Sequence, residues 1–334
     1  TRESNYYMAQ GRAIRHIISL FNNIEDLVAE NNRRLEANSD EGSTLEYIFF
    51  ALKWPNRLQI GYAALTSTLT WFHKKGMEME YDEYLQMLKM LQHGADSAQG
   101  DNTSKLKGLV SKWVNQEFKP DPLVDPNDKH SRRFTNDACG RLLCPAELNW
   151  NDPMIPKTHY RSEACYVVTD LSFPTYLYDK YTANPEDLEE GLFKSKILLQ
   201  GYKAVFISPS SAKDVKGDGD GMDVIQHNRH ARKTVSMIKV KKHVQFALSS
   251  VTLWRSVDGD FNYIQFWQTI VDFFENAPGQ EVQHRATRLL KWWTQKIFRR
   301  SHRNGLSDAA KENMSINTLA RQRTQHNNVT FNSS

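Results

Sequence analysis

The residues with the clearest chemical character lie in one basic segment near the end of the 334-residue chain, between Val282 and Arg303. This segment contains no aspartate or glutamate. Helical spacing of about 100° per residue places an apolar stripe on one side and a positively charged stripe beside it. Cations neutralise phosphates and an exposed tryptophan can stack on an unpaired base, so the stripe predicts a nucleic-acid contact. The residues expected in this contact are Arg285, Arg288, Trp292, Lys296, Arg299 and Arg303.

Other interpretations of the basic stripe stay open. Basic amphipathic helices also bind anionic membrane surfaces. In a third interpretation the stripe is solvated, or pairs with acidic side chains of a protein partner or with the acidic residues Glu186 to Glu190 of the same chain. The protein is then a protein-only scaffold that binds no nucleic acid. A second basic run extends the patch if it is exposed: Arg232, Lys233, Lys239, Lys241 and Lys242.

Three cysteines offer a weak zinc alternative. Cys139 and Cys144 have a C-x4-C spacing, with His159 and Cys165 downstream. These residue types can hold zinc, but the spacing is looser than in zinc knuckles or ribbons, which favours ordinary buried thiols. An odd, low cysteine count also does not indicate a disulfide framework. We therefore expect no metal and no other cofactor.

A group of acids offers the alternative of a metal-assisted enzyme. Paired carboxylates can hold a metal or perform general acid-base catalysis. The sequence contains no phosphate loop, no dinucleotide fingerprint and no G-x-S-x-G motif. We therefore favour a non-enzymatic interaction protein and keep the enzyme as the alternative. The residues in question are Asp137, Glu147, Asp152 and Asp170, with His159 nearby.

The secondary-structure elements that must position these residues are predicted to be mainly helices. The apolar pattern predicts one helix from Ile14 to Val28, a second opened by the capping box of Ser43 and Glu46, and a break or kink at Pro55. A helix near Tyr81 is expected to end at Gly94, and another follows at Leu106 to Val114.

The second half of the chain combines irregular and helical segments. Seven prolines between Lys119 and Thr182 make long helices improbable there. Asn184 and Pro185 predict a helix start. The remaining expected elements are a buried helix or strand at Lys196 to Ile207, helices at Arg232 to Trp254 and Phe261 to Phe274, a turn at Asp258-Gly259, and the basic helix.

Composition sets the class of protein. A 40% hydrophobic content is enough for a sizeable core, and the net charge of +4 is mildly basic. No apolar run reaches the ~18 residues of a membrane span. We expect a mainly α, single helical domain over 1–303 with a shared core, and an intracellular protein, cytoplasmic or nuclear. Its parts are a helical layer (5–118), a proline-rich irregular segment wrapping the core (119–183) and a helical set (184–303), followed by a disordered tail (304–334).

An ordered set of strings carries a family resemblance. The strings are GRAIRHI at Gly11 to Ile17, HGADSAQGDNTSKLKG at His93 to Gly108, GRLLCPAELNWNDP at Gly140 to Pro153, SPSSA at Ser208 to Ala212, FALSSVTLWRSVDGDFNYIQFWQTIVDFFE at Phe246 to Glu275, and LLKWW at Leu289 to Trp293. Together they resemble an uncharacterised domain family abundant in mushroom-forming basidiomycete fungi. The resemblance implies a fungal protein with one family domain, and it supplies no activity and no functional residues.

Overall fold

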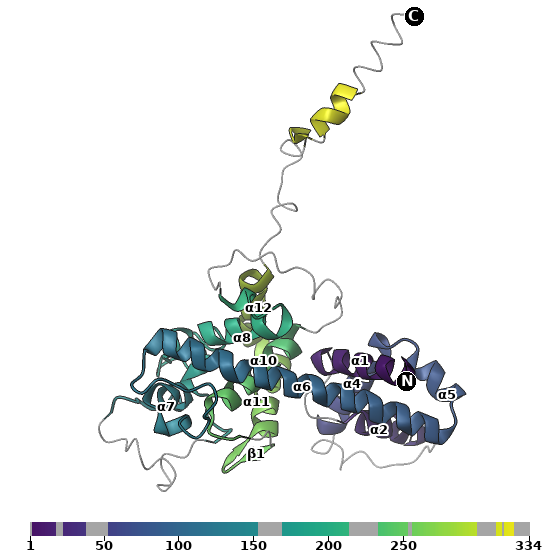
Figure 1. Ribbon diagram of the computed structural model, residues 1–334, viewed down its shortest axis with the longest axis horizontal. Helices are drawn as coiled ribbons and strands as arrows, with labels where there is room; N and C mark the ends of the chain where they lie inside the picture. The colour runs from purple at the N-terminus through teal and green to yellow at the C-terminus, as the bar shows by residue number, and fades with distance from the viewer. Residues whose placement is uncertain are drawn as a thin grey trace, which may run out of the picture.

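The computed structural model describes residues 2–17, 23–37, 53–152, 169–213, 233–252, 256–298, 312–315 and 317–323. Within these ranges the protein is mainly α-helical, as the sequence predicts (Figure 1). The α-helices are α1 (Arg2–Ile17), α2 (Ile24–Ala37), α4 (Lys53–Thr68), α5 (Phe72–Glu78), α6 (Tyr81–Phe118), α7 (Asp137–Leu143), α8 (Lys196–Phe206), α10 (Lys233–Leu248), α11 (Tyr263–Glu275) and α12 (Gly279–Phe298). Short 3₁₀ helices are η2 (Arg133–Thr135), η3 (Thr175–Leu177), η4 (Asp179–Tyr181) and η5 (Ser211–Lys213), and β1 (Val257–Asp258) pairs antiparallel with β2 (Phe261–Asn262).

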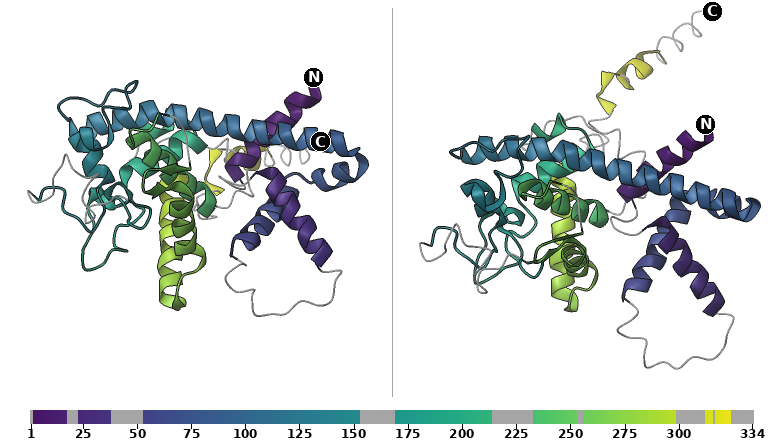
Figure 2. Two further views of the ribbon diagram at one scale, coloured as in Figure 1. Left: turned by 90° about the horizontal axis from the view of Figure 1, so that it is seen from below. Right: turned by 60° about the horizontal axis from the view of Figure 1, so that its bottom comes forward.

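The long helix α6 is the axis of the molecule, as both views of Figure 2 show. Its N-terminal half packs with α1, α2, α4 and α5 around one buried apolar cluster. Its C-terminal half packs with α7, α8, α10, α11 and α12 around a second, larger cluster that begins at Leu106. The structure therefore differs from the single shared core that the sequence predicts. The two parts also touch directly, because Arg57 of α4 pairs with Asp272 of α11.

The predicted end of a helix at Gly94 is wrong, because Gly94 lies inside α6. Here α1 crosses α6 with a glycine on each helix. A Cβ on Gly94 would lie 2.1 Å from the carbonyl oxygen of Met8, and one on Gly11 would lie 1.9 Å from that of Leu91. The absence of a side chain thus allows two backbones to meet, and the expected helix break does not occur.

Other boundaries also differ from the prediction. The pattern from Ile14 to Val28 belongs to two helices, α1 and α2. No helix starts at Asn184, because its side chain accepts a hydrogen bond from the backbone of Glu186 at 3.0 Å and the chain continues as turns. The segment that begins at Lys196 was predicted as a helix or a strand, and it is a helix. The predicted turn at Asp258-Gly259 joins β1 and β2.

Several predicted features lie wholly or partly outside the described residues. These are the capping box at Ser43, residues 153–168 of the irregular segment, and most of the predicted tail. Of the predicted tail, residues 312–315 and 317–323 are described, and residues 317–323 are helical. None of the helices in the described ranges is long and apolar enough to cross a membrane.

Candidate nucleic-acid interface

Helix α12 positions the predicted basic stripe. It starts at Gly279, the residue after Pro278. The positive φ of Gly279, 82°, turns the chain away from α11. Ala286, Leu289 and Trp293 are buried on one face, and the indole N–H of Trp293 donates to the carbonyl oxygen of Phe193 at 2.9 Å. Because this face is fixed against the core, the neighbouring face of α12 is exposed.

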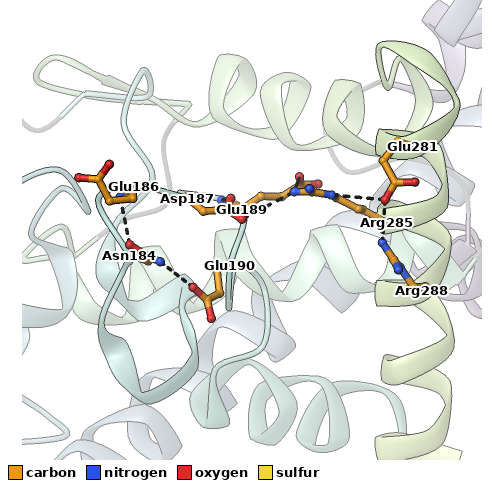
Figure 3. A network of polar contacts seen from close by, with 8 residues as sticks. All are labelled: Asn184, Glu186, Asp187, Glu189, Glu190, Glu281, Arg285 and Arg288. Atoms are coloured by element: carbon orange, nitrogen blue, oxygen red, sulfur yellow. Dashed lines mark hydrogen bonds and ion pairs between the residues drawn. The ribbon is translucent and has the colours of Figure 1, made fainter.

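The guanidinium of Arg285 lies among three carboxylates (Figure 3). It donates to Glu189 at 3.1 Å and lies 3.7 Å from Asp187, both in the turns that precede α8. Glu281, one helical turn earlier on α12, lies 3.8 Å away. The side chain of Arg285 is 45% exposed, so it remains in contact with solvent while its charge is compensated.

Arg288 is the second arginine of this network. Its guanidinium donates to the same Glu281 carboxylate at 3.1 Å, and its side chain is 68% exposed. Three carboxylates thus face two guanidiniums at the N-terminal half of α12. This matches the interpretation in which the stripe pairs with the acidic residues of the same chain, and it makes this half a poor attractor of polyanions.

The surroundings of Trp292 differ from those of the arginines. Its half-buried ring meets Trp293 edge-on, with 6.1 Å between the ring centroids. The ammonium groups of Lys194 and Lys296 each lie 5.9 Å from the centroid of the Trp292 ring, within cation–π range. In the described parts of the chain, neither these lysines nor the exposed Lys291 lies within ion-pair distance of a carboxylate.

Sequence reasoning missed Lys194 and the pocket that it helps to line. Lys194 follows the acidic residues in sequence, and no periodic pattern links it to α12. The pocket has a volume of about 470 Å³ between the acidic turns and α12. Apolar side chains of Leu192, Phe273, Leu289 and Trp292 line it together with charged side chains from both sides. Arg299 and Arg303, also predicted for this surface, lie outside the described residues.

The predicted extension of the patch along α10 is wrong for Lys241 and Lys242, because both are buried. The Lys241 ammonium lies 3.0 Å from the centroid of the Phe193 ring and 5.0 Å from that of Phe274. Burial lowers the pKa of Lys241 well below its usual value. Apolar residues surround these two lysines in the sequence from Val240 to Leu248, and this pattern could have indicated that the lysines are buried. Arg232 and the side chains of Lys233 and Lys239 lie outside the described residues.

The zinc alternative gains no support from the described cysteines. Cys139 and Cys144 are both buried free thiols. Burial raises the pKa of Cys139 to about 12, which disfavours the thiolate that zinc binds. His159 and Cys165 lie outside the described residues. Within the described ranges, no three His, Cys, Asp or Glu side chains are grouped so that they could hold a metal ion.

The acids of the enzyme alternative have separate local contacts. Asp137 accepts the indole N–H of Trp150 at 3.0 Å, and Glu147 accepts the hydroxyl of Ser172. Asp170 accepts the backbone N–H of Asn262 at 3.0 Å. Asp152 ends a turn, where its N–H donates to the carbonyl of Asn149 at 2.9 Å. These contacts stabilise turns and loops.

The fold and this surface define a mainly α-helical protein with a mixed-charge pocket beside a basic helix. The chain belongs to the family of unknown function DUF6698, whose family model matches residues 93–298. The match therefore begins within α6 and covers the elements around the second cluster, including the pocket and α12. It does not include the GRAIRHI string of the resemblance. Comparison with curated proteins and with solved structures finds no match.

Proposed function

We propose that the chain is a non-enzymatic interaction protein that binds single-stranded nucleic acid through the C-terminal half of α12. The observation that supports this proposal is the placement of Trp292 between two lysines that have no described carboxylate partner. A ring flanked by cations combines base stacking with phosphate neutralisation, the two contacts that single-strand binders use. The proposal includes a fungal source and an intracellular location, cytoplasmic or nuclear.

The sequence after α12 adds to this argument. Arg299, Arg300 and Arg303 follow Lys296 without an intervening acid. Positive charge is thus concentrated from Lys291 onward, while the first half of the helix is compensated. Single strands are favoured over duplexes because duplex bases are already stacked on one another and offer no free face to Trp292.

The test is a fluorescence anisotropy titration with labelled single-stranded DNA and RNA at ~50 mM salt, the low end of the range in which salt dependence is informative. We expect binding that weakens steeply as salt is raised. Trp292→Leu should weaken it by about 1–3 kcal/mol, the usual contribution of one stacked base. The control for the effect of charge alone is Lys89→Gln with Lys112→Gln, which removes two exposed charges of α6 and should leave the affinity close to that of the wild type. Absence of binding at ~50 mM salt removes the proposal.

A second candidate function rests on the other half of α12. The pairing of Arg285 with Asp187, Glu189 and Glu281 favours a protein-only scaffold, because a compensated surface does not attract nucleic acid. Affinity purification with and without nuclease separates the two candidates. Co-purifying proteins that persist after nuclease support the scaffold, and proteins lost after nuclease support a nucleic-acid bridge.

A further inference from the structure

The acidic turns opposite α12 hold their carboxylates in a fixed arrangement. Asp187 accepts the backbone N–H of Glu189 with one side-chain oxygen, at 3.0 Å, and directs the other toward Arg285. The amide of Asn184 donates to Glu190 at 2.7 Å. Gly191, with a φ of 71°, accepts backbone hydrogen bonds from Asp179 and Lys194. The acids are therefore part of a hydrogen-bonded scaffold of turns, and the long arginine side chains are the more adaptable partners.

Carboxylates and phosphates present similar oxygen acceptors to a guanidinium. We propose that Asp187 and Glu189, together with Glu281, act as an internal substitute for phosphate that occupies Arg285 and stops the nucleic-acid strand near Trp292. This inference rests on the proposed function, because it specifies how far the same binding surface extends. In this inference Arg285 holds the acidic turns against α12 and does not contact nucleic acid, although the sequence places Arg285 in the basic stripe.

The obstacle to a strand is repulsion and not the strength of the ion pairs. Exposed ion pairs contribute little, so a phosphate could displace them at small cost. The displaced carboxylates would nevertheless remain near the phosphate, because hydrogen bonds hold the Asp187 side chain and the backbone of the turn at Glu189. Like charges at this distance oppose binding.

Arg288 marks the boundary of the site. It lies one helical turn before Trp292 and its described ion-pair partner is Glu281, which is itself largely exposed. A strand that stacks on Trp292 can reach Arg288 but meets the carboxylates one turn further on. The surface therefore fits a short unpaired segment or a strand end that enters from the C-terminal end of α12.

The test neutralises the two turn acids with D187N and E189Q. Both substitutions keep a side-chain oxygen, so the N–H of Glu189 retains its acceptor at position 187. We expect tighter binding and a salt slope steeper by about 0.7 for each additional phosphate contacted. A slope change of 0.7 corresponds to about 8-fold in affinity between 1 M and 50 mM salt. The charge-matched control, E80Q with E83Q, alters two exposed acids of the N-terminal part and should leave the slope unchanged.

A double-mutant cycle with R285Q separates release of Arg285 from a general change of charge. If Arg285 is released to contact phosphate, the gain from D187N/E189Q is smaller when R285Q is also present, because only the relief of repulsion by the two acids remains. An equal gain in both backgrounds means that only the net charge matters, and it overturns the inference. Circular dichroism checks that each variant is folded, and E189Q alone replaces the double variant if it is not.

Failure of the inference and failure of the proposed function give different results. Wild-type protein that binds neither DNA nor RNA removes both. Wild-type protein that binds, while D187N/E189Q binds with the same affinity and slope, removes the inference and leaves the proposed function in place.

Discussion

The surface of α12 and the C-terminal end of α10 both gather cations, but the partners of these cations differ. On α12, exposed arginines face carboxylates, and lysines flank an aromatic ring. At the end of α10, Lys129 and Arg132 are buried and face backbone carbonyl groups. A cation that is exposed can exchange its partner for a ligand, whereas a buried cation holds the fold together. Charge in the sequence indicates function only once burial is known.

The buried pair satisfies the end of a helix. The last carbonyl groups of an α-helix have no partner within the helix. Arg132 donates to the carbonyl oxygen of Ala247 at 2.6 Å, and Lys129 donates to that of Phe246 at 2.6 Å and also to that of Val251. These two side chains thus join the segment after α6 to the C-terminal end of α10.

The surroundings of Lys241 differ from those of Lys129 and Arg132. Its amine is fully buried in α10 and has no hydrogen-bond partner among the described residues. The rings of Phe193 and Phe274 are its described neighbours. Burial of an amine without an acceptor costs free energy, which the ring contacts offset in part. The contrast between Arg132 and Lys241 predicts opposite effects of removing their charges.

The largest effect is expected at Arg132. Its guanidinium donates to carbonyl oxygens at 2.6 to 3.2 Å, and Arg132→Met removes this donor from the buried carbonyl of Ala247 and from two part-buried carbonyls of the segment after α6. The Lys107 carbonyl keeps the hydroxyl of Ser111 as a donor, at 2.9 Å. We expect a loss of about 3–5 kcal/mol in the free energy of unfolding, measured by urea denaturation. The acceptors are the carbonyl groups of Lys107, Asp125, Pro126 and Ala247.

The neighbouring Arg133 is the control for this prediction. It makes one ion pair, at 3.4 Å, with Asp258. Both side chains of this pair are mostly buried, 16% and 14% exposed, so Arg133→Met should cost about 1–3 kcal/mol, less than Arg132→Met. Equal losses for the two variants would contradict the assignment of Arg132 as the structural cation.

A smaller effect of opposite sign is expected at Lys241. Lys241→Met replaces a buried amine by an apolar side chain of similar length and should stabilise the protein by about 1–2 kcal/mol at pH 7. Burial lowers the pKa of Lys241 in the folded protein. At pH values between this lowered pKa and the ordinary lysine pKa, the folded protein therefore binds fewer protons at Lys241 than the unfolded chain does. Stability should therefore rise with pH from 7 to 9, by up to about 1.4 kcal/mol per pH unit for this group.

Urea denaturation at pH 7, 8 and 9 measures both parts of this prediction. The increase in the free energy of unfolding from pH 7 to pH 9 should be smaller in Lys241→Met than in the wild type. It should be unchanged in Lys112→Met, which alters an exposed lysine of α6. Buried tyrosines oppose the trend at higher pH, because burial raises the pKa of Tyr178 to about 12 and its stabilising contribution is lost above pH 10. A pH slope that Lys241→Met leaves unaltered would show that Lys241 is not the source.

The smallest effect on stability is expected at Arg285. Its ion pairs are exposed, so Arg285→Gln should change the free energy of unfolding by less than about 1 kcal/mol. Differential scanning fluorimetry at low and high salt measures the change. A large loss would mean that the acidic turns depend on Arg285 for folding.

Local patterns predicted the helical class and several individual helices. Asn262 accepts from the backbone N–H of Ile264 at 2.9 Å and starts α11, and Ser195 caps α8 in the same way. Caps of this kind act within one turn of helix and are visible in sequence, although the prediction of these two elements used apolar residues alone. The turn at Asn184 shows their limit, because the same asparagine side chain also stabilises a non-helical turn.

Features that depend on contacts between distant segments were not predictable. The role of Gly94 depends on Gly11 of a different helix, and the burial of Lys241 depends on Phe193. Within the candidate site, sequence identified the basic stripe and named the acidic residues Glu186 to Glu190 as possible partners. It could not indicate which arginines pair with them, nor place Lys194 beside Trp292, because no periodicity connects these segments.

The central claim is that the two halves of α12 differ in function, and salt dependence measures this most directly. Dissociation constants for a labelled single strand should be compared across salt concentrations for wild-type protein, K194Q/K296Q and R285Q/R288Q. We predict that the lysine pair lowers the salt slope by about 1.4, the value for two phosphate contacts, and that the arginine pair lowers it by no more than about 0.7. Equal reductions for both pairs, or a larger one for the arginines, would contradict the division of the helix.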